Sequence, residues 1–128
     1  VNRFVAGFIG SPAMNFLPGE VGPDGRSVRL GLPGAPSLPM AHVAEPGRPV
    51  TVGLRPEHLA VDPGAAQVRL PIRAVESSGS LTYYTTDSDP ELMLVEQGRG
   101  TLRAGEVASL RVNPGDVHLF DRDTGAAL

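Results

Sequence analysis

The sequence predicts a small all-β domain, built as a sandwich or a barrel. Short runs in which apolar and polar residues alternate recur at roughly ten-residue intervals, a spacing typical of such folds. Turn-forming clusters such as GPDG, EPGRP, SSGS and NPGD separate the runs. The 128 residues include 16 glycines and 13 prolines without a regular period, which indicates many turns rather than a collagen-like or disordered chain. At this length one compact domain is expected.

The first notable stretch is the uncharged segment 4–18. It is shorter than the roughly 20 apolar residues that span a bilayer, and glycine and proline interrupt it. Asn2 can cap a short helix on which Phe4 and Phe8 lie four residues apart, and a new extended segment follows at 14–17. Because a helix of about two turns is marginal alone, we expect its aromatic side chains to pack against something else.

The strands are expected where apolar residues fall on one face, as Val68, Leu70 and Ile72 do. The later runs cover residues 27–32, 50–56, 68–77, 80–86, 91–97, 106–112 and 117–121. Within the third of these runs the alternation shifts at 74–75, which predicts a β-bulge. Eleven of the 28 residues in 22–49 are glycine or proline, so we expect part of that segment to be a long ordered loop.

Composition excludes several classes of function. The formal net charge is −3, which argues against nucleic acid as a partner, because such binding leaves a basic footprint. All eleven basic residues are arginine. Without lysine the chain cannot contain a Walker A phosphate loop or a Schiff-base lysine. Without cysteine it has neither disulfides nor thiolate chemistry.

The motif DTGA at 123–126 resembles the catalytic motif of retroviral-type aspartic proteases, which need two such aspartates sharing one proton. Only two residues follow it, too few to build a flap or a substrate cleft, and the preceding residue is Arg122 rather than a buried apolar one. We therefore expect a surface turn that joins two short strands.

The three histidines, His42, His58 and His118, are candidate zinc ligands by residue type alone. None of them pair at close ligand spacing, and the chain has no cysteine to complete a site. We expect each to be structural or exposed to solvent. No nucleophile elbow or serine–histidine pairing indicates hydrolysis either.

The segment LRPEHL at 54–59 has two interpretations. Arg55 should end a strand, because the residue before proline avoids the helical region, and Glu57 then lies in a single helical turn. The segment is either an ordinary transition from strand to turn or a polar contact at an interface. The residues alone leave both open.

Three segments in the same order resemble the C-terminal region of sugar-importing ABC ATPases of the MalK and UgpC type. The first is NRFVAGFIGSPAMNFLP at 2–18. The second matches the family pattern G-[IVL]-R-P-E-H at 53–58, and the third matches H-L-F-D-x-x-T-G-x-x-L at 118–128. The segment VESSGSLTYY also resembles the family's E-x-L-G segment through Glu76 and Gly79, with Ser78 where leucine is usual.

The resemblance implies an OB-fold barrel of the TOBE or MOP-like kind, with tandem barrel elements and a short N-terminal helix. Residues 1–12 would be the end of a linker helix from a missing ATPase domain, and 13–128 the regulatory domain. ATP and magnesium would bind in that missing domain, which leaves this part non-catalytic and without a cofactor or metal. In the family the domain holds two ATPase subunits together, and in some members it receives a regulatory protein. The ATPase domain would contact the membrane permease subunits, which places the protein in the cytoplasm at the inner face of the membrane without insertion.

The resemblance gives a set of candidate interface or regulatory residues. They are Phe4, Phe8, Arg55, Glu57, Glu76, His118 and Phe120. The alternative function is a small-ligand module of the molybdate-binding kind, which holds oxyanions or sugars with backbone amides and with basic or hydroxyl side chains. Against it, the sequence shows arginine and serine in turns but no distinct basic cluster. An independent protease or hydrolase is the third hypothesis, and it lacks the residues.

Overall fold

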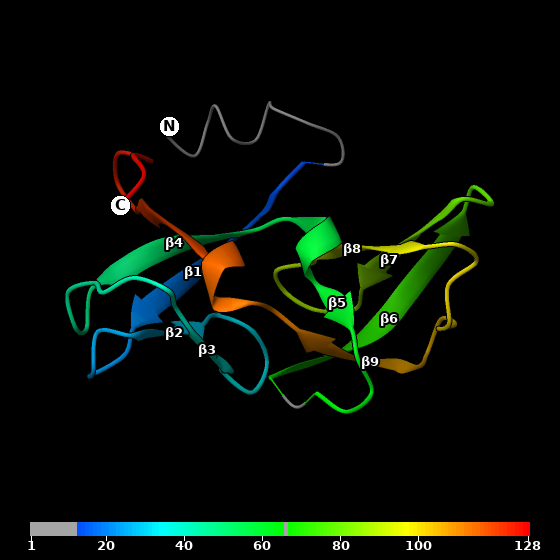
Figure 1. The fold of residues 1–128 in the computed structure, drawn as a ribbon, viewed down its shortest axis with the longest axis horizontal. Helices are drawn as coiled ribbons and strands as arrows, with labels where there is room; N and C mark the ends of the chain where they lie inside the picture. Colours follow the sequence, from blue (N-terminus) through cyan, green and yellow to red (C-terminus); the bar gives the residue numbers. More distant parts are fainter. Residues whose placement is uncertain (1–12, 66) are drawn as a thin grey trace.

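The computed structural model describes residues 13–65 and 67–128, and this part of the chain is all-β, as predicted (Figure 1). The short helix expected around Phe4 and Phe8 lies outside the described residues. Ten strands and two 3-10 turns make up the regular structure of the described ranges. None of these elements is a helix long and apolar enough to cross a membrane.

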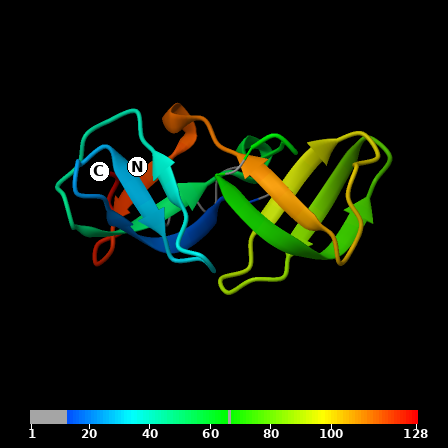
Figure 2. The same cartoon turned by 90° about the horizontal axis from the view of Figure 1, so that it is seen from below.

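The strands form two antiparallel five-stranded sheets. The first has the order β10-β4-β1-β2-β3, and the second has the order β5-β9-β6-β7-β8. The first sheet comprises β1 (Asn15–Val21), β2 (Ser27–Leu30), β3 (Ser37–Pro39), β4 (Pro49–Leu54) and β10 (His118–Asp121). The second comprises β5 (Ala60–Val61), β6 (Val68–Ser77), β7 (Leu81–Thr86), β8 (Met93–Gln97) and β9 (Val107–Arg111). Figure 2 shows the two groups of strands side by side, blue, cyan and red in one and green to orange in the other.

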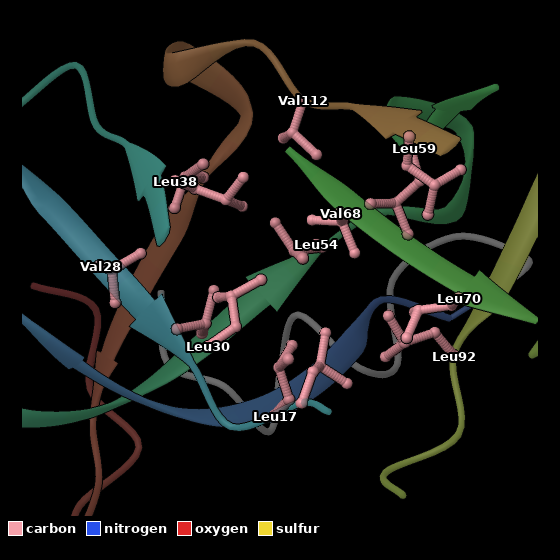
Figure 3. Close-up of a cluster of buried hydrophobic side chains, with 14 of the residues drawn as sticks. Leu17, Val28, Leu30, Leu38, Leu54, Leu59, Val68, Leu70, Leu92 and Val112 are labelled. Atoms are coloured by element: carbon pink, nitrogen blue, oxygen red, sulfur yellow. The ribbon is translucent and has the colours of Figure 1, made fainter. Parts of the chain in front are cut away.

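One hydrophobic core joins the two sheets. Each strand places alternate apolar residues inward, and these meet across the junction in a single cluster. The cluster includes Leu17, Leu30, Leu54, Leu59, Val68, Leu70, Leu92 and Val112 (Figure 3). Each fully buried leucine contributes roughly 1.5–3 kcal/mol to the hydrophobic stabilisation. The two sheets therefore fold as one unit rather than as separate domains.

Two details of the strand prediction can now be compared with the structure. The register of β6 against β7 shifts between Ile72 and Ala74, so the bulge lies at Arg73, next to the predicted position. The segment 22–49 contains β2 and β3, with a long irregular stretch at 40–48 before β4. The loop that its glycine and proline content predicts is thus confined to the second half of the segment.

The chain crosses between the sheets twice. It leaves the first sheet after β4 through η1 (Pro56–His58), and it returns after β9 through η2 (Pro114–Asp116). A proline begins each turn, where its fixed φ suits the first position. The two turns approach each other, because Nδ1 of His58 lies 3.6 Å from Oδ1 of Asp116. The crossovers therefore meet at one place on the molecule.

The segment DTGA forms a surface turn, as predicted. Oδ1 of Asp121 accepts hydrogen bonds from the backbone N–H groups of Asp123 (2.9 Å) and Thr124 (2.8 Å). Nη2 of Arg48 donates to the other carboxylate oxygen of Asp121 at 2.8 Å. The turn lets the C-terminal residues fold back along β10, where the N–H of Leu128 donates to the carbonyl of Leu119. Asp123 is exposed, so the motif has none of the burial that a shared catalytic proton requires.

A polar network closes the second sheet around the fully buried side chain of Tyr84. Its hydroxyl donates to Oε1 of Glu96 at 2.7 Å and accepts a hydrogen bond from the backbone N–H of Thr101 at 2.9 Å. Gly100 approaches this hydroxyl with φ +76°, a conformation that favours glycine. A Cβ at Gly100 would overlap the tyrosine oxygen and lie 2.8 Å from Cγ2 of Thr82.

Gly100→Ala is expected to destabilise the fold much more than Gly98→Ala. Both glycines have positive φ, at +76° and +80°, but a Cβ at Gly98 meets no atom within 4 Å. Gly98→Ala should therefore lower the free energy of unfolding by about 1 kcal/mol, the backbone cost alone. Gly100→Ala should lower it by about 3 kcal/mol, because it also disturbs the Tyr84 hydrogen bonds. Urea unfolding of both variants measures the difference, and equal losses would show that the space around Tyr84 is not the constraint.

Tyr84→Phe is expected to change how stability depends on alkaline pH. Burial raises the pKa of Tyr84 above its ordinary value of 10.0, helped by the neighbouring Glu96 carboxylate. The folded state thus holds the phenol proton more tightly than the unfolded state, so stability falls as pH rises above 10. Tyr84→Phe should be less stable at pH 8, by about 1–3 kcal/mol, and should lose less on going to pH 11. Parallel curves for wild type and variant between these pH values would contradict the assignment.

Candidate functional site

A pocket of about 470 Å³ lies on the outer face of the first sheet, where β4, β10 and the C-terminal residues meet. Its wall combines basic side chains, His42, Arg55 and His118, with the apolar side chains of Met14, Val117 and Phe120. It is the combination of charge and apolar surface in one hollow that makes this place a candidate site.

The strand register explains how these residues come together. His118 of β10 pairs with Gly53 of β4, and Phe120 pairs with Thr51. Because side chains alternate along a strand, His118 and Phe120 share the outer face, while Leu119 between them enters the core. Arg55 stands two residues beyond Gly53 and therefore lies on the same face.

Gly53 makes room for the apolar floor of the pocket. A Cβ on Gly53 would overlap the sulfur of Met14 and lie 2.8 Å from Cε2 of Phe120. Without it, Met14 and Phe120 pack into a small cluster on the outer face with Phe16 beside them. The rings of Phe16 and Phe120 meet edge to face, with centroids 5.7 Å apart.

Arg55 ends β4 as the sequence predicts, with φ −72° and ψ 138° before Pro56. Its side chain is half-buried at the pocket. Within residues 13–65 and 67–128, no carboxylate or carbonyl pairs with its guanidinium group. Glu57, two residues further along, does not pair with Arg55 and is exposed on η1.

The electrostatics of the pocket act on His118. Burial lowers the pKa of His118 below its ordinary value of 6.5, and the positive charge of Arg55 lowers it further. His58 and His42 act in the same direction, whereas Asp116 opposes them. His118 is therefore neutral at neutral pH, because burial and the charge of Arg55 both disfavour its protonated form.

His42 and His58 both lie close enough to His118 to lower its pKa, which their sequence spacing did not indicate. His42 comes from the loop before β4, His58 from η1 and His118 from β10. Among the described residues they do not form a group with the geometry of a metal site. The fold thus gathers Arg55 and the three histidines at one place.

The predicted site residues do not all meet at this pocket. Arg55, His118 and Phe120 line it, and Glu57 is exposed two residues beyond Arg55. Glu76 instead lies on β6 of the second sheet, beside a smaller hollow of about 290 Å³. Phe4 and Phe8 lie outside the described residues.

The sequence reasoning missed His42, Met14 and Gly53 as parts of the site. Gly53 could have been found, since a glycine inside a strand often marks a close approach of another group. The position of His42 depends on a loop whose course no local pattern reveals.

Comparison with known families assigns the chain along most of its length. A model described as the MalK OB fold domain matches residues 10–59, and one described as the TOBE domain matches 52–120. The second match includes both crossovers as well as Arg55 and His118.

Curated relatives agree with these matches. An ABC transporter ATP-binding protein of Sinorhizobium fredii, y4oS, is 41% identical over 99% of this chain and 34% of its own length. The sn-glycerol-3-phosphate import ATP-binding protein UgpC of Burkholderia cenocepacia is 43% identical over 95% of the chain and 36% of its own length. UgpC of a Ruegeria species is 35% identical over 95% of the chain. The chain thus spans about a third of the length of these relatives.

The fold is also found among solved structures. The cytoplasmic molybdate-binding protein ModG aligns with a TM-score of 0.65 over 82% of this chain and 94% of its own, at 14% sequence identity. At that identity the likeness concerns the fold alone. The TOBE match covers more than half of the chain and the relatives align along nearly all of it, so the chain belongs to the TOBE domain family, in the form found in ATP-binding proteins of MalK- and UgpC-type ABC importers.

Proposed function

We propose that the chain is the C-terminal regulatory and dimerisation domain of the ATP-binding subunit of an ABC importer for a carbohydrate or for sn-glycerol 3-phosphate. The observation that carries the proposal is the match to UgpC relatives over 95% of the chain, together with the two family models. The chain itself has no lysine for a phosphate loop, which supports a non-catalytic role for this part. ATP and magnesium would bind in a separate nucleotide-binding domain.

The proposed role follows from tethering. If two copies of this domain associate, each raises the effective concentration of the nucleotide-binding domain attached to the other. The subunits then stay together while their nucleotide sites open and close. A regulatory protein that binds one of these two states better would shift the balance toward it. The permease subunits would contact the nucleotide-binding domains at the cytoplasmic face of the membrane.

We infer that Arg55, Glu57, His118 and Phe120 mark the surface through which the domain communicates with the rest of the transporter. Arg55, His118 and Phe120 line one pocket, and Glu57 is exposed on η1, through which the chain leaves the first sheet. Glu76 would belong to a separate contact, since it lies on the other sheet.

The function is tested by replacing the matching region of Burkholderia cenocepacia UgpC with this chain. In cells that lack their own UgpC, the chimera is expected to restore uptake of sn-glycerol 3-phosphate, because the domain would keep the two ATPase domains together. UgpC without the region is the control and should restore little. Absent uptake by a chimera that is expressed and hydrolyses ATP would contradict the proposal.

The surface is tested in the same chimera by a matched pair of charge reversals. Glu57→Arg adds positive charge beside Arg55 and should reduce uptake several-fold. Glu45→Arg makes the same change at an exposed position in the loop before β4, away from the pocket, and should leave uptake unchanged. Equal uptake by both variants would remove the exposed side of η1 from the proposed surface.

Self-association of this chain alone is expected to be weak, with a dissociation constant on the order of micromolar or weaker. The reason is that its strong apolar contacts lie in its own core, while the apolar cluster on the outer face is small. Analytical ultracentrifugation over a wide concentration range measures this. A nanomolar dimer would show that tethering is stronger than proposed, and a strictly monomeric chain at millimolar concentration would contradict a dimerisation role for this part.

A further inference from the structure

The outer face of the second sheet carries a hollow of about 290 Å³ across β6, β7 and β8 (Figure 1). It is lined by Ala74, Glu76, Tyr83, Thr85 and Met93. The register makes these residues neighbours, because Met93 pairs with Thr85 and Thr85 pairs with Ala74. Met93 is 37% exposed, Ala74 and Glu76 are exposed, and the other two are half-buried. The hollow therefore presents accessible side chains that a further group can cover.

The side chain of Asn15 holds the start of β1 at the edge of this hollow. Its Nδ2 donates to the backbone carbonyl of Met93 at 2.8 Å, and its Oδ1 accepts a hydrogen bond from the N–H of Met93 at 2.8 Å. The amide thus pairs with the outer edge of β8, the last strand of its sheet, as a peptide group of another strand would. The segment 1–12 consequently joins the described chain within three residues of a contact with the hollow.

The segment 1–12 matches the hollow in its chemistry. Phe4 and Phe8 lie in a stretch too short to form a stable helix alone, so they require a surface to pack on. Arg3 is the charged residue of the segment, and Glu76 is the charged residue among the described ones that line the hollow. The two charges are opposite, which favours this combination of segment and surface.

The outer face of the first sheet is a poorer surface for the two rings. Met14 and Phe120 are 6% and 4% exposed there, and Phe16 packs against them. That apolar cluster is already covered, whereas Met93 on the second sheet is accessible.

The segment is long enough for the contact. Neighbouring strands lie about 4.8 Å apart and residues about 3.3 Å apart along a strand, so Glu76 lies roughly 12 Å from Met93. Arg3 and residue 12 are nine residues apart, which corresponds to about 14 Å in a helix and about 30 Å in an extended chain. Either conformation reaches across the hollow.

We propose that the segment 3–9 of this chain docks in the hollow on the second sheet. Its aromatic side chains cover Met93, and the guanidinium group of Arg3 pairs with the carboxylate of Glu76. The inference concerns this chain alone and does not depend on the proposed role in transport. If a nucleotide-binding domain precedes the segment, the contact sets the place at which the chain from that domain meets the second sheet.

A thiol placed under the segment measures the docking. The chain has no cysteine, so Ala74→Cys adds a single thiol that lines the hollow. The further changes Phe4→Ala and Phe8→Ala should speed its reaction with a neutral thiol reagent about threefold or more, because they remove the apolar cover. In the control Val107→Cys the thiol lies at a position that is 57% exposed on β9, and its rate should be the same with and without the two alanines. An unchanged rate in the Ala74→Cys chain would overturn the proposal.

The ion pair is tested by exchanging its charges in the Ala74→Cys chain. Arg3→Glu brings two like charges together and should raise the rate about twofold, and adding Glu76→Arg should return it to the starting value. Each rate is divided by that of the same chain with both phenylalanines changed to alanine, which removes the direct effect of charge on the thiol. Arg103→Glu makes the same reversal at an exposed position away from the hollow and should change nothing. A rate that Glu76→Arg fails to restore would overturn the pairing.

The same measurement distinguishes the segment of this chain from that of a second copy. Docking within one chain makes the rate independent of protein concentration. A reaction that becomes faster on dilution would place the segment of a second copy in the hollow and overturn docking within the chain.

Discussion

The structure depends on one hydrophobic core that neither sheet could form alone. Each half of the chain has about the size at which a domain buries too little surface to be stable without help. The core solves this by bringing Leu54 and Leu59, where the chain leaves the first sheet, against Val68 and Val112 of the second half. The two crossovers must consequently run through the junction, and their turns are held close to each other.

This constraint also builds the site. Pro56 fixes the end of β4 at Arg55, and the turn at η2 delivers the chain to β10 with His118 as its first residue. The pairing of β4 with β10 then sets both side chains on the outer face. Core packing thus positions the pocket, and two residues of the core, Val117 and Leu119, also line it.

Sequence reasoning predicted the parts of this arrangement that local chemistry determines. Alternation along 68–77 and 117–121 identified strands and their inward residues, and the proline after Arg55 identified a strand end. The DTGA segment was correctly interpreted as a turn, because Asp121 can accept hydrogen bonds from the backbone of the next residues. These predictions succeeded because each depends on residues within a few positions of one another.

What depends on distant pairing could not be predicted. His42, His58 and His118 are separated widely in the sequence, and only the register of β4 with β10 and the course of the loop before β4 bring them together. For the same reason the net charge of −3 does not indicate where Arg55 and the histidines lie. Glu76 lies on the second sheet, away from the other candidates. Sequence order alone does not indicate to which sheet a strand belongs.

In two of the segments that carry the family resemblance, alternate residues face the core and the outer face of the sheet. In 53–58 and 118–121 the alternate residues Leu54 and Leu119 are buried in the core, so folding alone explains them. Their neighbours Gly53, Arg55 and His118 point to the outer face, where no carboxylate or carbonyl of residues 13–65 and 67–128 pairs with the half-buried Arg55. Core packing therefore does not explain these outer-face residues, which form the candidate site. The same pair of strands thus serves the core with one face and carries the candidate site on the other.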